Sequence, residues 1–164
     1  MSAAAGSVGH DELGWCLGVV LRAYTDEVGA VLGDLPHGHR GFQVLATVVH
    51  GDQRSQLALA GMLGIDRTVM TYLIDDLVTA DLVARQVDPA DRRQRRIVAT
   101  GRGTAVLAEL ERGVRKAEDV ALGSLDPQDR AVLRRLLTSV ACSLRQVAPA
   151  DPCAVVEDAL TATA

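Results

Sequence analysis

The sequence is poor in aromatic residues, which make up 2% of its 164 residues: Trp15, Tyr24, Phe42 and Tyr72. Modules that bind single-stranded nucleic acid stack bases on several rings of one surface. The shortage of rings therefore argues against that class of protein. The net charge of −4 also argues against a generally basic nucleic-acid coat, so any DNA binding needs a local basic patch.

Cysteines are few and long apolar runs are missing. Cys16, Cys142 and Cys153 are an odd number without regular spacing, which indicates neither a disulfide framework nor a zinc ribbon. The first residues have neither the charged nor the continuous apolar region of a signal peptide. No apolar run reaches the roughly 18 residues of a membrane span. The sequence thus predicts a cytoplasmic protein without membrane association.

Hydrophobic residues make up 48% of the chain, enough for one domain over residues 1–164. Apolar residues at steps of three and four predict helices, and capping residues mark several helix starts, namely Ser55, Asp66, Thr100 and Asp126 before Pro127. Two short β-capable runs, 82–87 and 95–99, flank a turn and predict a hairpin. The tail, 147–164, holds prolines and small residues and is predicted to be mobile.

The order of these elements predicts a mainly α fold with a small β-hairpin wing. A winged helix-turn-helix over about 38–100 is flanked by helices over about 11–32 and 103–146. The terminal helices carry more apolar surface than a small winged helix can cover, which predicts that two copies pair through them. Closure of these stripes within one chain is the alternative.

A basic cluster follows the helix-turn-helix. Residues 85–96 hold five arginines and two aspartates, and Arg92 and Arg93 lie at the hairpin tip, where guanidinium groups can enter a DNA minor groove. Arg95 and Arg96 point to opposite faces of a strand, so at most one of them continues that surface. The alternative is a solvated charged loop.

The helix over 66–80 has the pattern of a recognition helix. Ile65, Val69, Leu73 and Leu77 are predicted to form its buried stripe. Four side chains near its start fall mainly outside that stripe: Arg67 for guanine, Thr68 and Thr71 for phosphate or a thymine methyl, and Tyr72 for phosphate. Acidic residues farther along would repel phosphate, so only the first two turns are expected in the groove. A plain amphipathic helix is the alternative.

Three segments carry a resemblance to the MarR family of bacterial regulators. The first begins with Gln56-Leu57-Ala58, extends through Leu63–Thr71 and continues with Leu77, Leu82-Val83 and Arg85. The second is the wing segment Asp88–Arg93, and the third is Thr100-Gly101-Arg102-Gly103. The sequence departs from the family at Asp81, where glycine is frequent, and at Ala99 and Gly101. Asp tolerates the left-handed conformation better than most residues, so the turn at Asp81 is expected to persist.

The resemblance implies a homodimeric transcription factor, usually a repressor. Such a protein binds a palindromic operator in double-stranded DNA and is released by a small organic effector. The expected DNA contacts are Ser55, Arg67, Thr68, Thr71, Tyr72, Arg92, Arg93, Arg95 and Arg96. Asp91 is expected to buttress a wing arginine. The expected effector pocket lies near Trp15, Tyr24, His37, His39 and Phe42.

Two alternatives to ligand control stay open. Cys16 resembles the peroxide-reactive cysteine of one branch of the family, which would make the protein a thiol-based oxidation sensor. A helical dimer that binds a protein partner is the second, although it leaves the arginine-tipped wing unexplained. No cofactor is indicated, no metal site is predicted from His37 and His39 with His10 or His50, and no catalytic motif indicates an enzyme.

Overall fold

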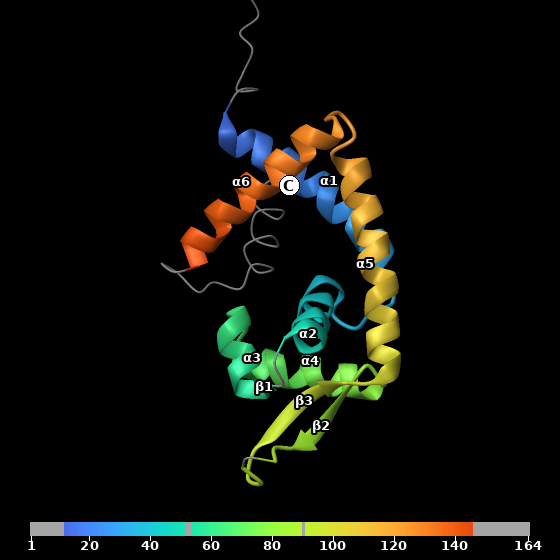
Figure 1. Cartoon of the computed structure of the whole chain (residues 1–164), viewed down its shortest axis with the longest axis vertical. Coiled ribbons are helices and arrows are strands. Elements are labelled where there is room, and N and C mark those ends of the chain that lie inside the picture. The colour runs from blue at the N-terminus through green and yellow to red at the C-terminus, as the bar shows by residue number, and fades with distance from the viewer. Residues whose placement is uncertain (1–11, 52–53, 90, 146–164) are drawn as a thin grey trace, which may run out of the picture.

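The computed structural model describes residues 12–51, 54–89 and 91–145, so the tail predicted over 147–164 lies outside the described residues. The chain forms two parts joined by one long helix (Figure 1). One part contains α1 (Leu13–Leu32) and α6 (Pro127–Arg145), and the other contains the winged helix. The connecting helix, α5 (Gly101–Ala121), extends from the wing to the terminal helices.

The winged helix contains three helices and a small sheet, as predicted. The helices are α2 (Gly38–His50), α3 (Gln56–Leu63) and α4 (Arg67–Thr79). Strands β2 (Val83–Val87) and β3 (Arg95–Ala99) form the antiparallel hairpin. The prediction missed β1 (Arg54–Ser55), which pairs antiparallel with β3 and gives the order β1-β3-β2. Two residues without an apolar alternation carry no strand pattern in the sequence.

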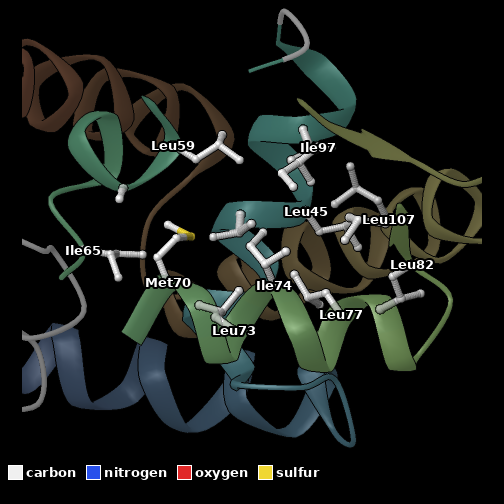
Figure 2. Close-up of a cluster of buried hydrophobic side chains, with 14 residues drawn as sticks. Leu45, Leu59, Ile65, Met70, Leu73, Ile74, Leu77, Leu82, Ile97 and Leu107 are labelled. Atoms are coloured by element: carbon white, nitrogen blue, oxygen red, sulfur yellow. The ribbon is translucent and has the colours of Figure 1, made fainter. Parts of the chain in front are cut away.

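The main core lies between α2, α3, α4, the sheet and the start of α5. Leu45, Met70, Leu73, Ile74 and Leu77 are fully buried there, together with Leu59, Ile97 and Leu107 from the surrounding elements. Figure 2 shows these side chains converging on one cluster between the helices. This packing fixes α4 against the rest of the lobe, so the opposite side of α4 faces solvent.

The predicted stripe of α4 is partly wrong. Leu73 and Leu77 are buried, but Val69 is 38% exposed, and Met70 and Ile74 take its place in the core. A row of residues four apart drifts about 40° around a helix at each step, because an α-helix has 3.6 residues per turn. Ile65 precedes the cap Asp66 and so does not set the phase of the helix, and Val69 lies about 100° around the helix from Met70, at the edge of the buried face.

The start of α5 is fixed against the turn before the wing. Thr100 caps the helix: its Oγ1 accepts a hydrogen bond from the Gly103 amide (2.9 Å) and donates one to the Asp81 carbonyl (2.7 Å). Asp81 has a φ of 57°, the left-handed conformation expected for it. A Cβ on Gly103 would collide with the backbone carbonyl of Leu82. The Thr-x-x-Gly segment thus supplies a cap and a close backbone approach.

The terminal helices bury one side and expose the other. Val28 and Leu32 of α1 pack with Val114 and Ala117 of α5 in a second, smaller cluster. Ion pairs of Arg130 and Arg134 with Glu118 and Asp119 hold α6 against α5 at 3.0–3.3 Å. Many of their other large apolar side chains are exposed in the single chain: Leu13, Trp15, Leu17, Val19, Val20, Val120, Val132, Leu136, Leu137, Val140 and Leu144.

Among the described residues, no single helix is long and apolar enough to cross a bilayer. Only α3 and α4 taken together reach that length and hydropathy, and they are bent by 117° at the break between them.

Candidate nucleic-acid interface

The first turns of α4 present the predicted contact residues to solvent. Asp66 caps the helix, because its Oδ1 accepts hydrogen bonds from the amides of Thr68 (2.8 Å) and Val69 (3.2 Å). These bonds, that of Val69 first, hold the pKa of the Asp66 carboxyl below its usual value. Arg67, Thr68, Thr71 and Tyr72 are all exposed, and Tyr72 is 64% exposed. The helix therefore offers this polar face to a partner.

A hydrogen-bonded network joins α4 to α3 and to the root of the wing. Gln56 Nε2 donates to Thr71 Oγ1 at 2.8 Å, and Arg85 donates to Gln56 Oε1 at 3.3 Å. The Arg85 guanidinium also forms an ion pair with Asp75 at 2.7 Å. The prediction missed Gln56, Asp75 and Arg85 as site residues, because their contact depends on the packing of three elements far apart in the chain.

Ser55 has a structural role in the same region. It lies in β1 and caps α3, since its Oγ accepts a hydrogen bond from the Ala58 amide at 3.2 Å. The cap was predicted from the sequence, and the structure confirms it. A contact of Ser55 with DNA remains a prediction.

The wing tip is held by Asp91. Its Oδ1 accepts a hydrogen bond from the Arg93 amide and its Oδ2 accepts one from Gln94 Nε2, both at 3.0 Å. These bonds, that of Arg93 first, lower the pKa of the Asp91 carboxyl. Asp91 therefore supports the turn through the backbone of Arg93, and no ion pair joins it to an arginine in the described part of the chain.

The wing arginines differ in their exposure. Arg92, Arg93 and Arg95 are exposed, and within the described ranges none of the three forms an ion pair with a carboxylate. Arg96 is half-buried, and its buried Nε has no hydrogen-bond partner among the described residues. Arg95 pairs with Val87 and Arg96 with Gln86, so the two arginines alternate faces of the sheet as expected.

The arrangement is that of a known family. Residues 41–94, which include α4 and most of the wing, match the model of the MarR family. Over this segment the winged helix of the chain is similar to the MarR family. The prediction of that family from the helix-turn-helix and wing segments is confirmed.

Solved structures with the same fold extend the similarity to the terminal helices. The transcriptional repressor CouR, solved bound to a 23-mer DNA duplex, is 25% identical; the match covers 86% of this chain and 99% of CouR with a TM-score of 0.71. A MarR family protein of Mycobacterium tuberculosis, in complex with p-aminosalicylic acid, is 25% identical over 79% of this chain and 98% of its own, with a TM-score of 0.64. BpsR of Bordetella bronchiseptica, whose DNA binding is regulated by 6-hydroxynicotinic acid, is 22% identical over 83% and 98%, with a TM-score of 0.68.

The MarR-type fold does not gather the predicted effector residues around one cavity. An apolar groove of about 470 Å³ lies between α1, α5 and α6, and Tyr24 alone among the five predicted residues lines it. His39 lies beside Tyr24, with ring centroids 6.2 Å apart, and burial lowers its pKa. His37 binds Asp76 of α4 at 2.8 Å, Phe42 packs against both cores, and Trp15 is 49% exposed on α1.

None of the remaining candidates that the structure describes lines this groove. Cys16 is partly exposed on α1, one residue from a groove-lining leucine, Leu17. His50 pairs with Glu111 at 2.6 Å, while His10 lies outside the described residues. His37, which precedes α2, and His39, in the first turn of α2, thus have different neighbours. Whether Cys16 is oxidised remains a prediction.

Proposed function

We propose that this protein is a transcriptional repressor that binds a palindromic operator as a homodimer. The observation that carries this proposal is the exposed polar face of α4 beside a wing whose Arg92, Arg93 and Arg95 have no carboxylate partner within the described ranges. The first turns of α4 would enter a major groove, and the wing arginines would enter the adjacent minor groove. The structural similarity to the DNA-bound repressor CouR supports this assignment.

The dimer is supported by the uncovered apolar face of the terminal helices. Val132, Leu136, Val140 and Leu144 follow one another at steps of four along α6 and are 38–62% exposed. A second copy would cover this row and the exposed apolar residues of α1. A twofold axis would also place two α4 helices on successive turns of one face of the duplex.

Release from DNA is assigned to a small organic effector. The similar structures that hold p-aminosalicylic acid, or whose DNA binding responds to 6-hydroxynicotinic acid, support this class of ligand. An effector that lowers DNA affinity must itself bind less tightly to the DNA-bound dimer, because the coupling is reciprocal. We place the protein among regulators and not enzymes, as MarR-family members are.

The proposal is tested by footprinting the full chain on duplexes that it selects from a random double-stranded library. The protected site should be an inverted repeat with half-sites about 10 bp apart. Affinity should fall steeply with salt, because arginines that contact phosphate release counterions. Folded protein that protects no inverted repeat at low salt would refute the proposal, and binding that does not weaken with salt would refute the role of the wing.

A further inference from the structure

We propose that Thr71 identifies a thymine of the operator through its Cγ2 methyl group, and that Gln56 is the residue that positions it. The inference rests on the proposed function and adds a specificity determinant to it. It follows from the directions of the hydrogen bonds that join Asp75, Arg85, Gln56 and Thr71.

The direction of each bond is fixed by the arginine. A guanidinium only donates hydrogen bonds, so the group of Gln56 that faces Arg85 must be its oxygen, as the 3.3 Å contact with Oε1 shows. The Gln56 amide nitrogen then faces Thr71, and it can only donate there. Asp75 anchors the arginine at 2.7 Å, and thus maintains the orientation of the whole chain of bonds.

The Thr71 hydroxyl consequently both accepts and donates a hydrogen bond. Its oxygen accepts from Gln56 Nε2 at 2.8 Å, and its single proton is donated to the carbonyl of Arg67 at 2.9 Å. No proton is left for a phosphate oxygen, for guanine O6 or N7, or for thymine O4, all of which are acceptors. Apart from the second lone pair of the oxygen, the part of this exposed side chain that is not engaged is the methyl group.

Among the bases, thymine is the one that presents a methyl group in the major groove, and apolar contact with it is a recognised mode of readout. Thr71 is one helical turn beyond Arg67 on α4, so both side chains belong to the part of the helix expected in the groove. A competing contact is open to the second lone pair of Thr71, which can accept a hydrogen bond from adenine N6 or cytosine N4. Thr71→Ser removes the methyl group and Thr71→Val removes the hydroxyl, so the two variants distinguish the methyl contact from the lone-pair contact.

The test uses the full chain and the duplex that it selects from a random double-stranded library. Each thymine is replaced in turn by deoxyuridine, which lacks only the methyl group, and affinity is measured by fluorescence anisotropy. One thymine per half-site should be sensitive, with a loss of about fourfold per half-site, the effect of one buried methyl-sized group. Thr71→Ser should lose the same factor on the thymine duplex and no longer distinguish deoxyuridine from thymine.

Two further variants complete the test. Thr71→Val keeps a methyl group and should retain the sensitivity to deoxyuridine. Gln56→Ala removes one of the two hydrogen bonds that hold the Thr71 rotamer and leaves only the bond to the Arg67 carbonyl, so the discrimination should decrease while the unfolding midpoint changes little. Thr79→Ser is the matched control, because Thr79 is also exposed and also donates to the carbonyl four residues before it, at 2.9 Å from Asp75 O, but lies at the far end of α4.

The outcomes distinguish a failure of the Thr71 methyl contact from a failure of the proposed function. Sequence-specific binding in which no thymine is sensitive to deoxyuridine, or in which Thr71→Ser keeps the sensitivity, would overturn the methyl contact and leave the regulator intact. Loss of binding in Thr71→Val with a preference for adenine or cytosine at that position would show that the lone pair makes the contact. Failure to select any duplex would refute the proposed function, and the inference with it.

Discussion

Two aspartates of α4 have basic partners on other elements. Asp75 pairs with Arg85 of β2 at 2.7 Å, and Asp76 pairs with His37, which precedes α2, at 2.8 Å. The sequence alone predicts that these carboxylates repel phosphate. Arg85 compensates the charge of Asp75, and the Asp76 carboxylate lies within hydrogen-bond distance of His37 Nε2. The cost of placing the second half of α4 near DNA is therefore smaller than the sequence indicates.

A second residue, Asp91, makes the conformation of the wing tip depend on pH. Its pKa is lowered in the folded chain by the Arg93 amide first and by Gln94 second. The stabilising contribution of a carboxyl with a lowered pKa is present above its ordinary value, near 3.8, and is lost as pH falls through the lower folded value. We expect the Arg93 amide resonance to stay constant from neutral pH to about pH 5 and to move below about pH 4, as measured by NMR.

The variants of Asp91 give the matching test at neutral pH. Asp91→Ala should weaken DNA binding about three- to tenfold, the effect of about one lost hydrogen bond in the turn. Asp91→Asn keeps an Oδ1 acceptor for the Arg93 amide and should lose less. An Arg93 resonance that is unmoved in Asp91→Ala would contradict the assigned role.

At the scale of the element, local chemistry predicts helix ends better than it predicts packing faces. The caps Ser55, Asp66 and Thr100 start their helices as predicted, because a cap depends on residues two or three positions apart. The sequence pattern places Val69 on the core face, because it continues a row from Ile65, which the structure places before the helix. The network of Gln56 with Arg85 could not be predicted, because it joins residues 29 positions apart through tertiary packing.

The junction of α5 with the winged lobe offers a paired test of packing. Gly103→Ala should destabilise the fold by about 1–3 kcal/mol, because the new Cβ meets the backbone of Leu82, which cannot move aside as a side chain can. Gly101→Ala is the control in the same turn, where a Cβ meets nothing within 4 Å. It should leave stability unchanged or raise it by up to about 1 kcal/mol. Urea unfolding measures both, and equal effects would show that the close approach is not what requires Gly103.

At the scale of the whole molecule, the two parts of the chain have different surfaces. The winged lobe has a continuous core and exposes the polar side chains of α4 and of the wing, whereas α1 and α6 leave an apolar row and the groove beside Tyr24 uncovered. The sequence predicts the excess of apolar surface but leaves open whether one chain could close it. In the part of the chain that the structure describes, the row remains exposed, which favours a second copy.

The variant that tests this surface introduces one charge into the apolar row. Leu136, 50% exposed on α6, lies between Val132 and Val140. Leu136→Glu should leave the fold intact and weaken the dimer by at least tenfold, because a carboxylate would be buried without a partner between two copies. Ala131→Glu adds the same charge to an exposed position on the other side of α6 and should leave the dimer unchanged.

The mass of the protein–DNA complex, measured by native mass spectrometry on the selected duplex, tests the central claim most directly. The account predicts two 17.3 kDa chains per duplex for the wild type and for Ala131→Glu. For Leu136→Glu it predicts single chains that bind much more weakly. One wild-type chain per duplex, or two chains of Leu136→Glu bound as tightly as the wild type, would contradict it.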